Sequence, residues 1–249
     1  MKILITGSSS GLGEELARKY ATKDNTLFLL ARREDRLKKL QDELKPSCKD
    51  VQILVADVTE FESLQEKIKT IDSIDMVILN AGISVGHSKE VTSFKDFQKL
   101  YNVNVLAQHA ILEILLPKFV EQKSGKIVFI SSLASLISMP TSLVYSSTKR
   151  AINAYAEGLR YNYNKHGIKV INILPGFIKS EMTDKNEFKM PFILSTEDGV
   201  CRIIKAIERE KRIYAFPFRF HAIIDIISKY ITKTFKRKNC KLDTLRFRL

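Results

Sequence analysis

Short apolar segments rich in β-branched residues alternate along the chain with longer stretches whose apolar residues recur every three or four positions. Most of the short segments are apolar at nearly every position, which is typical of strands buried on both faces of a parallel sheet. The longer stretches have the periodicity of the helices that connect such strands. The pattern predicts an α/β, Rossmann-type fold, a doubly wound parallel sheet of about seven strands with helices on both faces. The expected strands are residues 2–6, 27–31, 51–56, 76–79, 126–131, 169–174 and 212–216.

Length and composition fit one globular domain. The chain has 249 residues, of which 45% are apolar and 28% charged, and a single core is usual at this size. Cys48, Cys201 and Cys240 are odd in number and far apart, which favours free thiols in a reducing compartment over disulfides or a metal site. No signal peptide is recognisable, and no apolar run approaches the ~18 residues of a spanning helix. We therefore expect a cytoplasmic protein without a bound metal.

A glycine-rich turn follows the first expected strand, and a helical pattern begins at Glu14. Such a turn offers backbone N–H groups and the positive end of a helix to a pyrophosphate, and its glycines let the ligand approach closely. The sequence therefore indicates a dinucleotide site, and the alternative is a Gly/Ser-rich connection that binds nothing. The residues of the turn are Gly7, Ser8, Ser9, Ser10, Gly11, Leu12 and Gly13.

The second expected strand ends in Ala31-Arg32-Arg33. Many dinucleotide folds place an acid here, which accepts a hydrogen bond from the ribose 2′-hydroxyl. That acid is missing, and the guanidinium of Arg32, with help from Arg33, suits a 2′-phosphate instead. This favours NADP(H) over NAD(H), and the alternative is a solvated basic turn at a helix start.

Tyr145 and Lys149 are four residues apart in an amphipathic stretch that runs to about Lys165. This spacing places the phenol and the ammonium on one face of a helix. A neighbouring ammonium, joined by an oxidised nicotinamide, is expected to draw the pKa of the tyrosine down from its usual value of about 10. A lone pair of this kind is more often an exposed tyrosine and lysine.

These motifs together resemble the short-chain dehydrogenase/reductase family over at least residues 1–184. The glycine turn and the Tyr145/Lys149 pair match two of its motifs, and Ser132 lies the family's usual thirteen residues before the tyrosine. Chance coincidence of all of them in this order is negligible, so the alternatives given for single motifs lose most of their weight. The other matching residues are Asn80, Ala81 and Gly82, Asn104, and Pro175 and Gly176.

The resemblance implies roles for the catalytic set. Tyr145 would exchange a proton with the carbonyl or alcohol oxygen, and Lys149 would tune Tyr145 and hold the nicotinamide ribose. Ser132 would hydrogen-bond the same substrate oxygen, with Ser131 and Ser135 as near alternatives, and Asn104 would bind a water that links Lys149 to solvent. For the cofactor, the resemblance implies contacts from Asp57, Val58, Ile178 and Ser180 as well as from the motif residues.

The resemblance thins after Ser180, in a segment that would close over the substrate. We divide the single domain into a cofactor-binding and catalytic core (1–184), a substrate-covering segment (185–211) and an end (212–249) with the last strand, an amphipathic helix and a basic tail. A partly hydrophobic substrate follows weakly, with core packing equally able to explain each apolar residue. These residues are Phe177, Met182, Phe188, Met190, Phe192, Ile193, Leu133, Ile137, Met139 and Leu143.

The C-terminal part carries a large share of the positive charge. The whole chain has a formal net charge of +13, and from Lys229 to Leu249 eight basic residues face Asp243 alone. We expect the amphipathic helix from about Phe220 to Ile231 to pack on this domain or on a neighbouring subunit, and contact with an anionic membrane is the alternative. A nucleic-acid partner is not supported by any recognition motif. A homo-oligomer is expected from the resemblance alone.

The sequence thus predicts an NADP(H)-dependent oxidoreductase that acts on a small-molecule carbonyl or alcohol. The alternative is an NADP(H)-binding regulator or scaffold without turnover. The complete set of Asn104, Ser132, Tyr145 and Lys149 argues against that alternative, because a protein that only binds the dinucleotide needs no proton relay.

Overall fold

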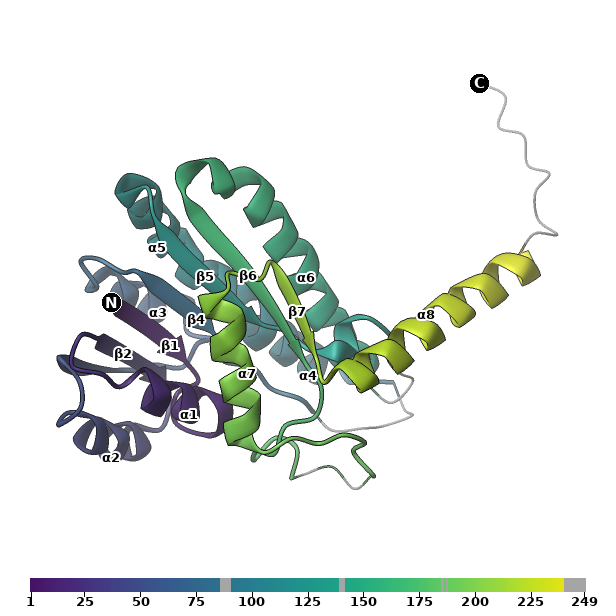
Figure 1. Ribbon diagram of the computed structural model, residues 1–249, viewed down its shortest axis with the longest axis horizontal. Helices are drawn as coiled ribbons and strands as arrows, with labels where there is room; N and C mark the ends of the chain where they lie inside the picture. The colour runs from purple at the N-terminus through teal and green to yellow at the C-terminus, as the bar shows by residue number, and fades with distance from the viewer. Residues whose placement is uncertain (86–90, 139–141, 185, 187, 240–249) are drawn as a thin grey trace.

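The computed structural model describes residues 1–85, 91–138, 142–184, 186 and 188–239, with backbone alone for 230–239. They form one sheet of seven parallel strands in the order β3-β2-β1-β4-β5-β6-β7 (Figure 1). The predicted fold class is confirmed, and each expected strand lies within about two residues of an observed one. The strands are β1 Lys2–Thr6, β2 Thr26–Ala31, β3 Asp50–Val55, β4 Met76–Leu79, β5 Gly125–Ile130, β6 Ile168–Pro175 and β7 Ile213–Phe216.

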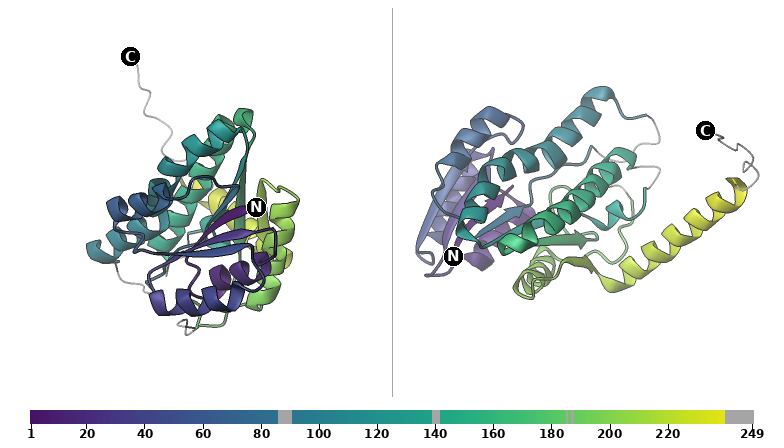
Figure 2. Two further views of the ribbon diagram at one scale, coloured as in Figure 1. Left: turned by 90° about the vertical axis from the view of Figure 1, so that its left-hand side faces the viewer. Right: turned by 90° about the horizontal axis from the view of Figure 1, so that it is seen from above.

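Helices cover both faces of this sheet (Figures 1 and 2). One face carries α1 Gly11–Tyr20, α2 Glu34–Leu44 and α7 Thr196–Glu208. The other carries α3 Phe61–Lys69, α5 Ala107–Gln122 and α6 Leu143–Tyr163. Shorter elements are α4 Phe94–Tyr101, the π-helical turn η1 Asn102–Leu106, and the 3₁₀ turns η2 Leu133–Ser135 and η3 Asn164–His166.

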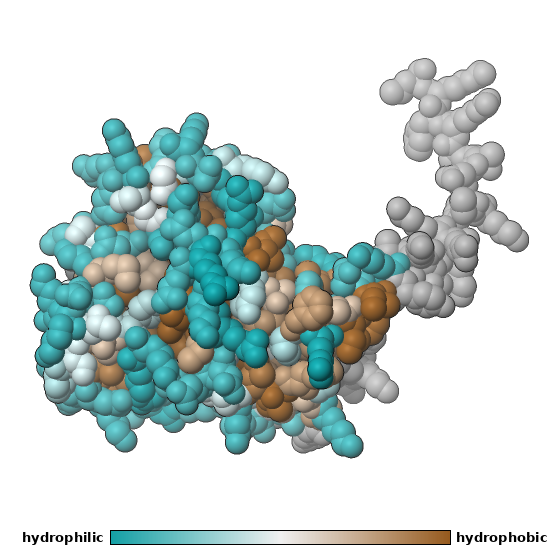
Figure 3. Space-filling model, in the orientation of Figure 1, coloured by the Kyte–Doolittle hydropathy of each residue, from teal (hydrophilic) through white to brown (hydrophobic). Residues whose placement is uncertain are grey.

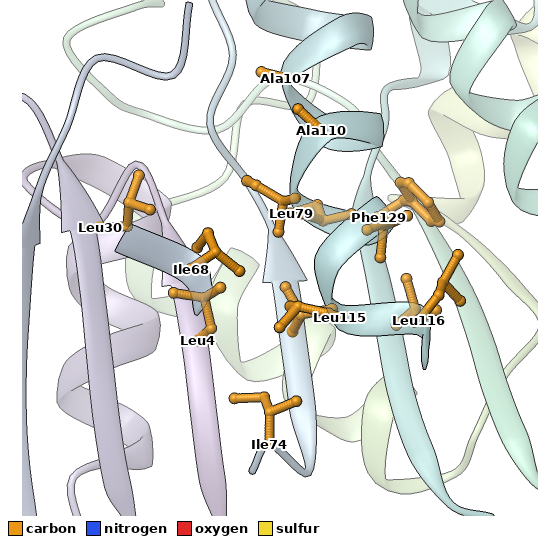
Figure 4. Close-up of a cluster of buried hydrophobic side chains, with 14 of the residues drawn as sticks. Leu4, Leu30, Ile68, Ile74, Leu79, Ala107, Ala110, Leu115, Leu116 and Phe129 are labelled. Atoms are coloured by element: carbon orange, nitrogen blue, oxygen red, sulfur yellow. The ribbon is translucent and has the colours of Figure 1, made fainter. Parts of the chain in front are cut away.

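Two separate cores explain why the strands are apolar at successive positions. In β1, Ile3 and Ile5 pack under α1, α2 and α7, whereas Leu4 packs under α3 and α5. Successive side chains of a strand point to opposite faces, so a sheet covered on both faces needs apolar residues at every position. Figure 4 shows the second core, in which side chains of the strands meet Ile68 of α3 and Leu115 of α5.

One helical run has the length and composition of a membrane span, contrary to the expectation from the sequence. It is the continuous run of α4, η1 and α5, Phe94–Gln122, and over half of its most apolar window is buried. Leu112, Leu115 and Phe119 are fully buried against the sheet. The apolar character of this run is that of a helix in the core.

The helix expected near the C-terminus is α8, Phe218–Asn239, which is longer than predicted. Its first turns pack on the body, where Phe220 and Ile224 join Leu133, Ile137 and Leu174 in a small apolar cluster. The rest of the ribbon extends away from the sheet (Figures 1 and 2). The expectation that α8 packs on this domain is therefore confirmed for its first turns alone.

The strand order fixes where a ligand can bind. The chain leaves β1 toward β2 and β3 on one side and later returns to β4 on the other. The loops that follow β1 and β4 therefore diverge at the carboxyl edge of the sheet, where open α/β sheets bind their ligands.

Candidate active site

The glycine turn between β1 and α1 depends on the absence of side chains. Gly7 and Gly11 have φ values of +68° and +57°, a region that L-residues with a Cβ rarely adopt. A Cβ on Gly13 would lie 2.3 Å from the carbonyl oxygen of Gly7. The turn is thus held against the start of α1, and this close packing requires glycine.

The turn is also tied to the loop after β4. Thr6 Oγ1 accepts hydrogen bonds from the backbone nitrogens of Asn80 and Ala81, both at 2.9 Å. Asn80 Nδ2 donates to the Thr6 carbonyl oxygen at 3.0 Å. Asn80 therefore fixes the loop after β4 against the end of β1, and its side chain has a structural role in the site.

The start of α1 fits a pyrophosphate. Ser10 stands at the N-cap position, but its side chain makes no capping hydrogen bond and its hydroxyl instead accepts one from Arg33 Nη2 at 2.6 Å. The first N–H groups of a helix have no partner within the helix. With the glycines leaving space before them, these groups and the positive end of α1 fit the cofactor phosphates.

Arg33 lies against the glycine turn. Besides Ser10, its Nε donates to Ser9 Oγ at 3.1 Å. Arg32 points the other way, with Nη1 at 3.4 Å from Asp57 Oδ2. Partial burial raises the pKa of Asp57, but hydrogen bonds from Thr59 and the nearby Arg32 outweigh burial, so the net pKa is lowered. The predicted adenosine residues Arg32, Arg33 and Asp57 thus gather beyond the ends of β2 and β3.

Glu181 joins this basic cluster and was not found from the sequence. Its Oε2 accepts from Arg33 Nη1 at 2.9 Å and its Oε1 pairs with Arg36. These two guanidinium groups lower the pKa of Glu181 to about 2, with Arg36 contributing most. No sequence signal links residues 145 or more positions apart, because the fold alone brings the segment after β6 beside α2.

Ser132 and Tyr145 meet at the opposite end of the site. Ser132 follows β5 and Tyr145 lies in the first turn of α6, and their side chains share a hydrogen bond. Ser131 instead donates to Asn153 Oδ1 at 2.7 Å, and Ser135 to the Ser132 carbonyl oxygen. The geometry therefore favours Ser132 over both alternatives that the sequence left open.

The chain's own groups raise the pKa of Tyr145, so the predicted lowering, which counted on an oxidised nicotinamide as well as on Lys149, stays a prediction. Burial raises the pKa of the Tyr145 phenol, and the hydrogen bond with Ser132 offsets this in part. Lys149 Nζ lies 5.7 Å from the ring centroid. Desolvation disfavours the phenolate, and it outweighs the hydrogen bond with Ser132 here.

Lys149 is an ammonium group in the interior. Its side chain is 3% exposed, and burial lowers its pKa to about 8. Nζ donates to the Ile130 carbonyl oxygen at 2.9 Å. An ammonium has three donors, so the group retains capacity for a ligand that reaches it from the Gly82 side.

Asn104 lies in the π-helical turn η1 and is fully buried. Its Oδ1 accepts from Ile83 N at 2.8 Å, while Nδ2 donates to Ile83 O and to Thr148 Oγ1. A Cβ on Gly82 would lie 3.4 Å from both Asn104 Oδ1 and Lys149 Nζ. Gly82 thus leaves room beside these two polar atoms, as the predicted water relay requires, and the water itself stays a prediction.

Comparisons with known proteins agree with this geometry. The family model described as "short chain dehydrogenase" matches residues 1–190. The chain belongs to the short-chain dehydrogenase/reductase family. It is 34% identical over 220 residues to an uncharacterized oxidoreductase of Myxococcus xanthus, covering 87% of each chain. It is 35% identical to an 11-beta-hydroxysteroid dehydrogenase-like protein of Arabidopsis thaliana, covering 83% of this chain and 69% of the relative. The protein is therefore an oxidoreductase by family.

Solved structures of the same fold hold both nicotinamide cofactors. A short-chain dehydrogenase from Sphingobium yanoikuyae in complex with NADPH has a TM-score of 0.82 at 22% identity, covering 100% of this chain and 98% of that one. One from Burkholderia phymatum in complex with NAD has a TM-score of 0.83 at 20% identity, covering 94% of each. At such identities the likeness establishes the fold of the dehydrogenase/reductase.

Some of the other predicted cofactor residues lie beside the glycine turn, and others have side chains that are buried in the cores. Ser180 lies beside the glycine turn, since a Cβ on Gly11 would be 3.4 Å from Ser180 Cβ. Ile178 and Val58 are buried in the cores, so they offer the site their backbone. Pro175 ends β6, and Gly176 N donates to Phe216 O at 2.7 Å. Among the described residues, no cluster of metal-binding side chains is found.

Proposed function

We propose that this protein transfers hydride between NADP(H) and a carbonyl or alcohol, with Tyr145 as general acid and base. The observation that carries the proposal is the meeting of Ser132 and Tyr145 beside the buried Lys149, on the same sheet edge as the glycine turn. The bound nicotinamide would supply and accept the hydride. The chain's own residues then have to position the carbonyl and move one proton.

Each residue has a task in the reduction. Tyr145 donates its phenolic proton to the carbonyl oxygen, and Ser132 hydrogen-bonds that oxygen as charge develops on it. Burial favours the protonated phenol, so the acid is ready in its neutral form at the start. Lys149 holds the ribose hydroxyls and returns a proton to Tyr145, with the Asn104 region as the path to solvent. In the oxidation each proton moves in the opposite direction.

Replacing Tyr145 by Phe tests the acid/base assignment. The change removes only the ionisable oxygen, so NADPH oxidation with a ketone and aldehyde panel should fall at least a thousandfold, or about 4 kcal/mol in barrier. NADPH binding, measured by cofactor fluorescence, should stay nearly unchanged. Tyr161→Phe is the matched control, because Tyr161 is exposed on the same helix. Activity of Tyr145→Phe within tenfold of wild type contradicts the proposal.

NADP(H) preference follows from the charges at the adenosine end. Ala31 places no carboxylate at the end of β2 for the ribose 2′-hydroxyl. The guanidinium groups of Arg32 and Arg33, which pair with Asp57 and Glu181 in this structure, suit a 2′-phosphate in charge. The hydroxyls of Ser9 and Ser10 already hold Arg33 in place. Such a preorganised fork loses little side-chain entropy when the phosphate binds.

The pair of changes Ala31→Asp and Arg32→Ala tests this preference. The new carboxylate repels a 2′-phosphate and accepts from a free 2′-hydroxyl, so the ratio of kcat/KM for NADPH to that for NADH should fall at least about a hundredfold. Lys38→Ala is the control, because Lys38 is an exposed cation of α2 that pairs with Glu34. If this ratio of kcat/KM values does not change, Ala31 and Arg32 do not contact the adenosine ribose of the cofactor.

The substrate is proposed to be at least partly hydrophobic. The segment after β6 turns apolar side chains toward the carboxyl edge of the sheet, with Phe177 stacked on Phe220 at 5.5 Å and in edge contact with Phe188 at 5.8 Å. Leu133 and Ile137, which follow Ser132 along the chain, pack beneath the first turns of α8. Met139 lies outside the described residues. Ketones and aldehydes with long alkyl or ring substituents are therefore the first compounds to screen.

A further inference from the structure

Helix α8 has two apolar faces. One of them packs on the body, and the other is exposed. Phe220 and Ile224 are four residues apart and face the body, where they meet Leu133 and Leu174. Ile223, Ile226 and Ile227 lie on a neighbouring face and are 43–67% exposed. An isolated exposed isoleucine needs no explanation, but three on one face of a projecting helix form an unpartnered apolar surface.

The exposed face continues onto the segment that covers the substrate site. Phe192 lies 6.0 Å from Phe220 between ring centroids, and both Phe192 and Ile193 are 42% exposed. Phe218 at the start of α8 is 77% exposed. Figure 3 shows hydrophobic residues gathered where α8 leaves the body. We call Phe192, Ile193, Phe218, Ile223, Ile226 and Ile227 the apolar patch.

Positive charge accompanies this patch. From Phe218 to Asn239 the sequence has six basic residues and one acid, Asp225, and Asp225 is already paired with Lys229 at 2.6 Å. After Ile226 and Ile227 the sequence continues with Lys229, Lys233 and Lys236, so lysines recur every three or four residues along the rest of the helix. Apolar residues flanked by lysines are the pattern of a helix that lies in a membrane interface.

We propose that α8 and the apolar patch dock this protein on an anionic lipid surface. A second copy of the chain would bring an equally basic helix to the same face, and like charges oppose such a symmetric pairing. A nucleic acid would satisfy the lysines but would leave the isoleucines in water. A bilayer with anionic headgroups matches both features, since the isoleucines enter the interface and the lysines reach the phosphates.

The docking has a consequence for the site. The patch includes residues of the substrate-covering segment, so the body would sit with this segment turned toward the lipid. Helix α8 has 22 residues and is about 33 Å long at the rise of an α-helix, which is enough to lie along the surface while the sheet stays outside it. The docking is independent of turnover and does not rest on the proposed catalysis.

Vesicle flotation of the full chain tests the proposal. The protein should float with vesicles of phosphatidylcholine mixed with phosphatidylglycerol and should stay at the bottom with phosphatidylcholine alone. Bound protein should fall at least about tenfold between ~0.1 M and ~1 M salt, where the Debye length shrinks from about 10 Å to about 3 Å. The double variant Ile226→Glu/Ile227→Glu should lose at least about tenfold in affinity, because it puts charge into the interface. Truncation after Lys229 should have the same effect while keeping the packed first turns.

Two controls separate docking from general charge and from misfolding. Ile213→Glu makes the same change at an exposed isoleucine at the start of β7 and should bind vesicles like wild type. Replacing Lys38, Lys39, Lys45 and Lys69 by Gln removes four exposed cations elsewhere and should cost little affinity. Absence of binding to anionic vesicles overturns the proposal, as does binding that survives the double variant. A dimer in light scattering that the double variant dissociates instead assigns the patch to a second copy.

Discussion

At the scale of one residue, burial of the Lys149 ammonium in the candidate site lowers the folding stability of the protein. The ammonium is buried, and burial lowers its pKa to about 8, against about 10.4 in an unfolded chain. Between these two values the unfolded chain binds more protons than the folded one, so stability must rise as the pH rises through this window. Below about pH 8 the folded protein bears the full cost of burying the charge.

Lys149→Met removes this titration. In urea unfolding of the cofactor-free protein, we expect wild type to gain about 1–3 kcal/mol relative to the variant between about pH 7.5 and pH 10. Shared titrations, such as that of Cys48, whose pKa burial raises, cancel in the difference. Parallel stability curves for the two proteins over this range would mean that Lys149 titrates normally.

At the scale of elements, the turn between β1 and α1 is where backbone geometry and ligand binding depend on each other. Gly13 is in α1, where alanine is ordinarily the better helix former by about 1 kcal/mol. Here a Cβ would collide with the Gly7 carbonyl at 2.3 Å, and backbone cannot move aside as a flexible side chain can. The contact overrides helix propensity.

Gly13→Ala should therefore destabilise the protein by about 1–3 kcal/mol and weaken NADPH binding, because the N-terminus of α1 is displaced. Gly158→Ala is the matched control. Gly158 is also helical, but a Cβ there meets nothing within 4 Å, so the change should stabilise by about 0.5–1 kcal/mol. Urea denaturation and cofactor fluorescence measure both effects, and equal stability changes in the two variants would argue against the contact.

At the scale of the molecule, α8 has a packed beginning and an extended remainder. Truncation after Pro217 exposes the cluster around Leu133 and Leu174 that Phe220 and Ile224 cover. Loss of the buried Ile224 and the partly buried Phe220 costs about 2–5 kcal/mol. The melting temperature should fall by about 6 °C or more. Truncation after Lys229 keeps both side chains and should melt within about 2 °C of the full chain. Similar melting of both truncated forms would show that the first turns of α8 contribute little.

The sequence by itself determined the strands, the sheet class and the glycine turn, and it predicted Tyr145 and Lys149 with one of three serines beside them. Strands buried on both faces must be apolar throughout, and phosphate and proton chemistry each require a few residue types at fixed spacing, so both leave local patterns. Contacts between distant segments leave none. The tertiary structure alone placed Glu181 beside Arg33 and Arg36, separated Ser132 from Ser131 and Ser135, and raised the pKa of Tyr145 through burial. It also divided α8 into a packed and an exposed part, since burial depends on what the rest of the chain brings to each face.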